Sequence, residues 1–363
     1  LKYSYLKIIG LMTGTSMDGI DVSLVSTNGI GLKRLNQNYF YEYSKKTKKI
    51  LLELLRRENI FNIKRKIELD NIVTNEHFKA LKKSNILNEC DYIGFHGQTI
   101  FHDPKNKYSV QLGNPKKLAE LCRKNVIYDF RSNDLMMGGQ GAPIAPIYHK
   151  LIIETKRLNL PCCFLNIGGV ANITYWDGKK LIGFDTGPGN ALMDNYMQKI
   201  SKGFYDKDGL LASQGKLNKQ AIEVFKNDEF FKLDPPKSLD RNSFLHFYNN
   251  LISQNVTPSD VMATLAEFTV ISIKLAFNHL PKNVENIIVT GGGYYNKYLM
   301  KRIKSTLNAK FYSENDLNLQ FNYIESELIA YLSARSIYQL PFTYPSTTGV
   351  SKPSSGGRTL LYL

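Results

Sequence analysis

The 363-residue sequence has no apolar run that approaches the roughly 20 residues of a membrane-spanning helix. Its N-terminus, "LKYSYLKIIGLM", carries lysines but lacks the apolar core and cleavage site of a secretory signal, so we interpret it as a first strand. We therefore expect a cytoplasmic protein without a membrane partner. The length exceeds that of one ordinary hydrophobic core, which favours two domains.

Cysteine and histidine are too few and too scattered for a disulfide framework or a structural metal. The four cysteines include a vicinal pair, Cys162 and Cys163, inside an apolar strand, where buried thiols are expected. The six histidines show no spacing typical of metal ligands. A structural metal is therefore not expected.

Acidic residues are in deficit, with 32 Asp and Glu against 47 Lys and Arg and a net charge of +15. Such a balance can indicate nucleic-acid binding. The lysines are scattered, however, through "KKTKK", "KRK", "LKK" and "NPKK", and they form no arginine-aromatic stripe. We expect no nucleic-acid partner, and the positive charge would instead attract an anionic small molecule such as a nucleotide.

Alternating strand and helix patterns predict an α/β fold. Helical spacing of apolar residues is present at 45–57, 67–83, 261–280 and 325–339. Another helix is expected to begin with Asn114 as its cap and Pro115 at its first position. Two stretches, "IIGLMTGTSMDGIDVSLV" and "CFLNIGGVANITYW", share the form of strand, glycine-bearing turn and strand. One such stretch near the start of each half predicts two similar domains that face a shared cleft.

Neither the P-loop pattern GxxxxGK[ST] nor a strand–GxGxxG–helix unit is present. The first hairpin can nevertheless cradle phosphate, because glycine leaves backbone N–H groups uncovered. Thr15 and Ser16 add hydroxyl donors, and Asp18 or Asp21 could hold a metal-bound water beside a polyphosphate. Taken alone, the stretch is equally consistent with a plain hairpin.

Two further glycine turns strengthen the nucleotide hypothesis. Gly168 and Gly169 form the turn of the second hairpin, and "VTGGGYYN" stands where a buried strand meets a helix. Backbone without side chains can approach a base or a ribose there, although a tight connection would also explain the glycines.

Longer motifs carry a resemblance to a known family. The stretches "GLMTGTSMDGID", "GFHGQT", "DFRSNDLMMGGQGAPIAP", "LNIGGVANIT", "GFDTGPGNALMD", "PPKS" and "VTGGGYYN" resemble the anhydro-N-acetylmuramic acid kinase family, of the sugar kinase, heat-shock ATPase and actin superfamily. The resemblance implies a two-domain actin-like ATPase (ribonuclease H-like) fold with nucleotide in the interdomain cleft. Residues 1–130 plus 325–363 would form the N-terminal lobe, and residues 131–324 the C-terminal lobe.

The resemblance also implies an activity. The family uses ATP, Mg²⁺ and water to open the 1,6-anhydro ring of its amino-sugar substrate and to phosphorylate O6, in peptidoglycan recycling. A homodimer is implied as well. The alternatives are a related kinase for an ordinary hexosamine and a non-sugar actin-like or chaperone-like ATPase.

Carried over onto this sequence, the resemblance implies a set of site residues. Asp185 of "FDTGPGN" would be the catalytic base, whereas its residue type alone is equally consistent with a turn or cap aspartate. No metal ligand is assigned. The expected ATP site comprises Gly14, Thr15, Ser16, Met17, Asp18, Gly19, Ile20, Asp21, Gly168, Gly169, Gly291, Gly292, Gly293 and Asn296.

Three residues are candidates for binding the sugar. Arg131 could bind the lactyl carboxylate of a muramic sugar in a bidentate fork, or it could be a loop arginine paired with Asp134. Glu327 could hydrogen-bond the sugar, or it could be a first-turn glutamate favoured by the helix dipole. His96 ends a buried strand, where it could contact the sugar or form a satisfied polar pair with Gln98.

The sequence also departs from the family pattern. After "PPKS" the family usually continues with Thr-Gly-Arg, whereas here Leu239, Asp240 and Arg241 follow. The tail after Val350 is only loosely similar to the family. We therefore expect the loop after "PPKS" to differ from its relatives.

Overall fold

The computed structural model describes residues 3–14, 17–56 and 63–362. The chain divides into two compact units, which are described separately below: unit 1 comprises residues 1–151 and 322–363, and unit 2 comprises residues 152–321. The sequence placed the boundaries at 130/131 and 324/325 instead. Residues 131–151 belong to unit 1 because they contact its C-terminal part. For example, the Gln140 N–H donates to the carbonyl oxygen of Thr348 at 2.7 Å. Among the described helices, none is both long and apolar enough to cross a membrane.

The main sheet of unit 1 has the order β13-β7-β4-β1-β2-β3. β1 and β2 are antiparallel, as are β2 and β3, whereas β4 and β7 run parallel to β1, and β13 closes the other edge antiparallel to β7. A separate hairpin is formed by β5 and β6. The strands are β1 (Leu6–Met12), β2 (Gly19–Thr27), β3 (Leu32–Glu42), β4 (Tyr92–Phe95), β5 (Gln98–Asp103), β6 (Tyr108–Leu112), β7 (Asn125–Tyr128) and β13 (Arg358–Leu360).

The sheet of unit 2 has the order β10-β9-β8-β11-β12. β8 pairs antiparallel with β9 and β9 with β10, whereas β11 runs parallel to β8 and β12 parallel to β11. Its strands are β8 (Cys162–Ile167), β9 (Val170–Trp176), β10 (Leu181–Pro188), β11 (Asn286–Thr290) and β12 (Lys310–Tyr312).

The two sheets share one topology. In each, the first three strands form an antiparallel meander, and the next two strands of the sheet run parallel to the first. The order third-second-first-fourth-fifth is that of the ribonuclease H-like fold. The predicted similarity of the two halves and the predicted fold class are therefore confirmed.

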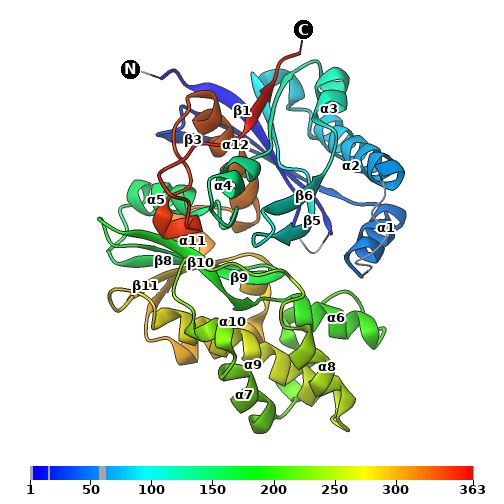
Figure 1. Cartoon of the computed structure of the whole chain (residues 1–363), viewed down its shortest axis with the longest axis vertical. Coiled ribbons are helices and arrows are strands. Elements are labelled where there is room, and N and C mark those ends of the chain that lie inside the picture. Colours follow the sequence, from blue (N-terminus) through cyan, green and yellow to red (C-terminus); the bar gives the residue numbers. More distant parts are fainter. Residues whose placement is uncertain (1–2, 15–16, 57–62, 363) are drawn as a thin grey trace. The chain divides into compact units, whose positions relative to one another are not determined.

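β1 is buried on both faces, which explains its continuous apolar sequence. Ile8 packs with Ala330 and Ala334 of α12, whereas Ile9 and Leu11 belong to the main core of the unit, on the opposite face. α12 crosses β1 at close range (Figure 1). The helices of unit 1 are α1 (Lys45–Arg56), α2 (Ile63–Ser84), α3 (Pro115–Cys122), α4 (Ser132–Met136), α12 (Ile324–Ile337) and α13 (Pro345–Thr348), and α5 (Pro146–Thr155) spans the boundary with unit 2.

In unit 2 the long helix α9 (Pro258–Phe277) packs on β10. Its Phe268 ring stacks on Phe225 of α7 with ring centroids 4.2 Å apart, within a group of phenylalanines that fills this core. The other helices of unit 2 are α6 (Ala191–Lys199), α7 (Lys219–Lys226), α8 (Leu245–Ser253), α10 (Lys297–Thr306) and α11 (Glu314–Leu317).

Several local predictions are confirmed. The Asn114 side chain accepts from the Lys117 N–H at 3.0 Å and caps α3, with Pro115 at the first helical position. All four cysteines are buried free thiols. The tail forms a strand, β13, that the sequence did not indicate, because a three-residue edge strand has too short a pattern to recognise.

Candidate functional site

Hydrogen bonds with neighbouring polar groups hold the β1–β2 hairpin of unit 1 in place. The Gly14 carbonyl oxygen accepts from the Met17 N–H and from Gln98 Nε2, both at 3.2 Å. Thr13 Oγ1 donates to the Gly97 carbonyl oxygen at 3.2 Å. The predicted donors Thr15 and Ser16 lie outside the described residues.

Met17 adopts a left-handed backbone conformation, with φ of 54°, and its side chain is completely buried. This conformation costs a non-glycine residue about 1–2 kcal/mol. Burial of the thioether side chain offsets that cost, since a fully buried methionine contributes about 1.5–3 kcal/mol. Met17 therefore anchors the hairpin in the core and can offer only its backbone to a ligand.

The next hairpin residues have roles in packing. A Cβ on Gly19 would lie 2.2 Å from the Tyr41 carbonyl oxygen, so glycine is required there by the neighbouring strand. Ile20 is fully buried in the core of unit 1. Asp18 forms an ion pair with Lys48 of α1. The sequence alone could not separate these packing roles from ligand binding.

Asp21 lies beside a second carboxylate that the sequence did not single out. Burial, and after it the charges of Glu325 and Asp18, raises the pKa of Asp21 to about 8. Glu325 is in the first turn of α12. The pKa of Tyr323, just before that helix, is also raised, by burial and then by Asp21. The N-terminus of α12 thus places Glu325 where its charge acts on Asp21.

Glu327, the glutamate that the sequence did single out, is bound to other protein groups. Arg34 Nε of β3 donates to both of its carboxylate oxygens, at 2.9 and 3.0 Å. Tyr148 of α5 donates its hydroxyl to the same carboxylate and accepts from Arg34 Nη2 at 2.9 Å. Because Glu325 and Glu327 are two residues apart on a helix, their side chains leave it in directions about 160° apart around the helix axis.

Arg131 and His96, both predicted to bind the sugar, are brought together. Arg131 Nε donates to His96 Nε2 at 3.2 Å, and Arg131 Nη1 donates to the Gly141 carbonyl oxygen at 2.7 Å. His96 Nδ1 then donates to the Gly97 carbonyl oxygen at 3.0 Å. Burial, and after it the charge of Arg131, lowers the pKa of His96 to about 3, so the imidazole is neutral. The Asp134 carboxylate accepts from the Gly141 N–H and from Thr348 Oγ1, both at 2.7 Å, and so organises the same loop.

In unit 2, Asp185 is a strand residue and not a helix cap. It lies within β10 opposite Asn172 of β9, next to a bulge, and it is 6% exposed. The residue that precedes α6 is Asn190. The Asp185 N–H donates to the Lys237 carbonyl oxygen at 2.9 Å, and Asp185 Oδ2 accepts from the Leu239 N–H at 2.8 Å. The carboxylate is therefore fixed by a backbone donor.

The second glycine hairpin is joined to the start of α6. The Gly168 carbonyl oxygen accepts from the Asn190 N–H at 2.7 Å, and that of Gly169 accepts from the Gly189 N–H at 3.0 Å. A Cβ on Gly168 would meet nothing closer than 3.6 Å. No packing reason therefore requires glycine at position 168, which suits the approach of a ligand.

The "VTGGGYYN" segment lies against the same hairpin. A Cβ on Gly291 would lie 2.4 Å from Asn166 Oδ1, and one on Gly293 would lie 2.4 Å from the Ile167 side chain. Gly292 has ordinary space, with 3.5 Å to the nearest atom. Asn296 caps α10 through a 3.0 Å bond from the Leu299 N–H to its Oδ1.

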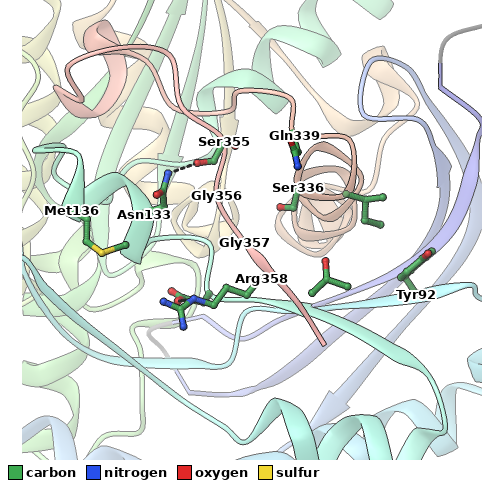
Figure 2. Close-up of a pocket in the computed structure, with 12 residues that line it drawn as sticks. Tyr92, Asn133, Met136, Ser336, Gln339, Ser355, Gly356, Gly357 and Arg358 are labelled. Carbon is green, nitrogen blue, oxygen red and sulfur yellow. Dashed lines mark hydrogen bonds and ion pairs between the residues drawn. The ribbon is translucent and has the colours of Figure 1, made fainter. Parts of the chain in front are cut away.

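A cavity of about 580 Å³ lies elsewhere in unit 1, where the C-terminal tail meets α4 and the end of α12 (Figure 2). Asn133 Nδ2 donates to the Ser355 carbonyl oxygen at 2.6 Å across one side of it. Arg358 forms an ion pair with Asp129 at 3.1 Å. None of the residues predicted to bind nucleotide or sugar lines this cavity. Its polar groups tie the tail to the sheet.

Two ribonuclease H-like units, each with a glycine-bearing hairpin between its first two strands, define the actin-like ATPase class. The model of one family, anhydro-N-acetylmuramic acid kinase, matches residues 6–361. The chain therefore belongs to the anhydro-N-acetylmuramic acid kinase family. It is thus a kinase, and neither an ordinary hexosamine kinase nor a non-sugar ATPase is favoured.

Two relatives of similar sequence agree with this assignment. An anhydro-N-acetylmuramic acid kinase of Rhodopseudomonas palustris (strain BisB18) is 38% identical, over 96% of this chain and 98% of the relative. One of Pelagibacter ubique is 37% identical, over 96% of each chain. Among solved structures, a ROK family glucokinase from Streptomyces griseus has a TM-score of 0.42 and 10% identity, over 90% of this chain and 97% of that one.

Proposed function

We propose that this chain opens the 1,6-anhydro ring of anhydro-N-acetylmuramic acid and phosphorylates O6 with ATP, giving N-acetylmuramic acid 6-phosphate in peptidoglycan recycling. The observation that carries the proposal is the buried Asp185, whose carboxylate is fixed by the Leu239 N–H in a chain of this family. Asp185 would take a proton from the water that attacks C1.

The chemistry needs only one carboxylate. Glycosidases commonly use two, one as a base toward water and one as an acid toward the leaving oxygen. Here the C1–O6 bond breaks as water adds to C1, and O6 takes the γ-phosphoryl group of ATP, with ADP as the leaving group. The phosphoryl group thus replaces the general acid.

Arg131 would bind the lactyl carboxylate of the sugar. His96 and the Gly141 carbonyl orient its guanidinium. Because His96 is neutral, its Nε2 accepts from the guanidinium without cancelling the positive charge that would attract the carboxylate. A guanidinium fixed in this way favours sugars that carry the lactyl acid over those that lack it.

ATP would be bound by backbone of the 14–21 hairpin and by the turns at 168–169 and 291–296. Gly168 and Gly292 support this role, because folding alone does not require glycine at either position. Amide donors aimed at phosphate oxygens stabilise the charge that shifts onto the leaving ADP.

Mg²⁺ would accompany the nucleotide near Asp21. Burial, and after it the charges of Glu325 and Asp18, raises the pKa of Asp21, and a divalent cation would favour the ionised carboxylate and offset those neighbouring charges. Among the described residues no cluster of three or more acidic, His or Cys side chains is arranged to hold a metal. The fit is thus to an ion that keeps water and phosphate ligands, as Mg²⁺ prefers. When bound, Mg²⁺ neutralises charge on the β- and γ-phosphates.

A homodimer, a cytoplasmic location and the absence of a nucleic-acid partner complete the proposal. They follow from the resemblance and the composition described above. Size-exclusion chromatography with light scattering tests the dimer, and a monomer at micromolar concentration would overturn it. Binding to duplex DNA at low salt would overturn the expected absence of a nucleic-acid partner.

The reaction is tested by supplying the purified chain with ATP, the anhydro sugar and ¹⁸O-labelled water. We expect one ¹⁸O at C1 and one phosphate at O6 in the product. N-acetylmuramic acid, which lacks the anhydro bridge, is the control substrate. Phosphorylation without label, or equal phosphorylation of the control sugar, would show an ordinary sugar kinase.

A further inference from the structure

The segment 237–239 runs beside β10 at Asp185. The Lys237 carbonyl oxygen accepts from the Asp185 N–H at 2.9 Å, and the Leu239 N–H donates to Asp185 Oδ2 at 2.8 Å. One bond holds the backbone of Asp185 and the other holds its carboxylate. The position of this segment therefore decides where the carboxylate points.

The side chain of Lys237 anchors this segment. Its Nζ donates to the Phe230 carbonyl oxygen at 3.0 Å and to the Leu233 carbonyl oxygen at 2.8 Å, and it lies 3.4 Å from Nε2 of His279, which itself bonds the Phe231 carbonyl oxygen at 2.9 Å. The ammonium group also lies 4.7 Å from the centroid of the Phe230 ring and 5.8 Å from that of Phe184, the residue before Asp185. Lys237 thus contacts β10 twice: its carbonyl oxygen accepts from the Asp185 N–H, and its ammonium group lies over the Phe184 ring.

Burial of this lysine has an energetic cost. Lys237 is only 5% exposed, and lysine is almost never buried to this extent without partners. Burial lowers its pKa to about 8, with Asp234 partly opposing that shift. A methionine would fill the same space between the phenylalanine rings at lower cost. Packing therefore does not explain a lysine here, whereas the two carbonyl contacts do.

We propose that Lys237 is a positioning residue for the catalytic base: it holds the 237–239 segment so that the Leu239 N–H orients and stabilises the ionised carboxylate of Asp185. This inference rests on the proposed function, in which Asp185 is the base. The N–H needed for that bond is a backbone group, so the bond does not depend on the side chain at position 239.

The test compares Lys237→Met with Lys232→Met in the full-length chain. Lys232 lies five residues before Lys237, in the helical turn Glu229–Lys232, and its side chain is 63% exposed and pairs with Glu229. For K237M we expect kcat to fall roughly 10-fold, with the KM values for sugar and ATP within about twofold of wild type. The acidic limb of the kcat–pH profile should move to higher pH, because the base loses a donor that favours its ionised form. K232M should match wild type.

A merely structural role for Lys237 would lower the melting temperature without moving the acidic limb, and that result would overturn the inference. An unchanged kcat in K237M would also overturn it. Lys237→Arg keeps a cation with donors and should recover part of kcat and of the pH profile; it carries the test if K237M does not fold. Asp185→Asn distinguishes failure of the proposed function from failure of this inference. Full turnover in D185N would show that Asp185 is not the base. An inactive D185N together with a normal K237M would show that Asp185 is the base but that Lys237 does not position it.

Discussion

Arg131 donates its Nε–H to the Nε2 atom of a buried, neutral His96 at 3.2 Å. This contact joins the loop after β7 to the residue that follows β4, and the neutral imidazole adds no charge beside the guanidinium. The hydrogen bond to His96 therefore fixes the orientation of the Arg131 guanidinium, which a loop arginine without such a contact would lack.

Replacement of Arg131 by Lys should weaken sugar binding selectively. A lysine cannot reproduce a bidentate contact, so we expect KM for the anhydro sugar to rise about 10-fold or more, while KM for ATP stays unchanged. Steady-state kinetics with the lactyl sugar and with its analogue that lacks the lactyl group provide the measurement. If KM rises equally for both sugars, Arg131 does not bind the lactyl carboxylate.

Glu327 and Glu325 should respond in opposite ways to amidation. Glu327→Gln removes the buried carboxylate that pairs with the partly buried Arg34, which should cost about 3 kcal/mol in the free energy of unfolding. Glu325→Gln removes repulsion on Asp21 and should leave stability unchanged or slightly raised. Urea denaturation of both variants decides this, and equal stabilities would contradict the structural role of Glu327.

Gly168 and Gly293 provide a matched test of ligand approach against packing. Gly168→Ala should fold normally, because its Cβ meets only an ordinary contact at 3.6 Å, yet it should raise KM for ATP. Gly293→Ala would place a Cβ 2.4 Å from the Ile167 side chain and should lower the melting temperature. An unaltered KM for ATP in a folded G168A variant would show that the β8–β9 hairpin is not part of the nucleotide site.

Acid should destabilise the protein through its buried histidines. Burial lowers the pKa of His149 to about 3 from the ordinary 6.5. Between these two values the unfolded state binds more protons, so stability is lost as the pH falls below about 6.5. One such histidine costs about 2 kcal/mol between pH 7 and pH 5.

The measurement is the free energy of unfolding against pH for wild type and His149→Gln. The variant should show a shallower loss between pH 7 and pH 5. His246→Gln is the control, because the His246 side chain is 62% exposed. A slope in H149Q equal to that of wild type would show that His149 does not contribute to acid lability.

Local patterns predicted much of the fold. The cap at Asn114 and the apolar run of β1 are read within a few neighbouring residues, so the sequence alone was sufficient for them. The short edge strand β13 was missed, because its pairing with β7 depends on residues more than 200 positions away. The division of the chain at 151/152 differs from the expected 130/131 for the same reason: Gln140 and Thr348 meet only in the folded chain.

The sequence by itself determined the α/β class, the duplicated hairpins and the family, because apolar periodicity and contiguous motifs are local properties of the chain. Only the tertiary structure decided that Glu325 and not Glu327 lies beside Asp21, that Gly168 and Gly292 are not required by packing, and that Lys237 anchors the segment beside Asp185. These assignments depend on which side chain faces which neighbour across distant segments, and residue type does not encode that choice.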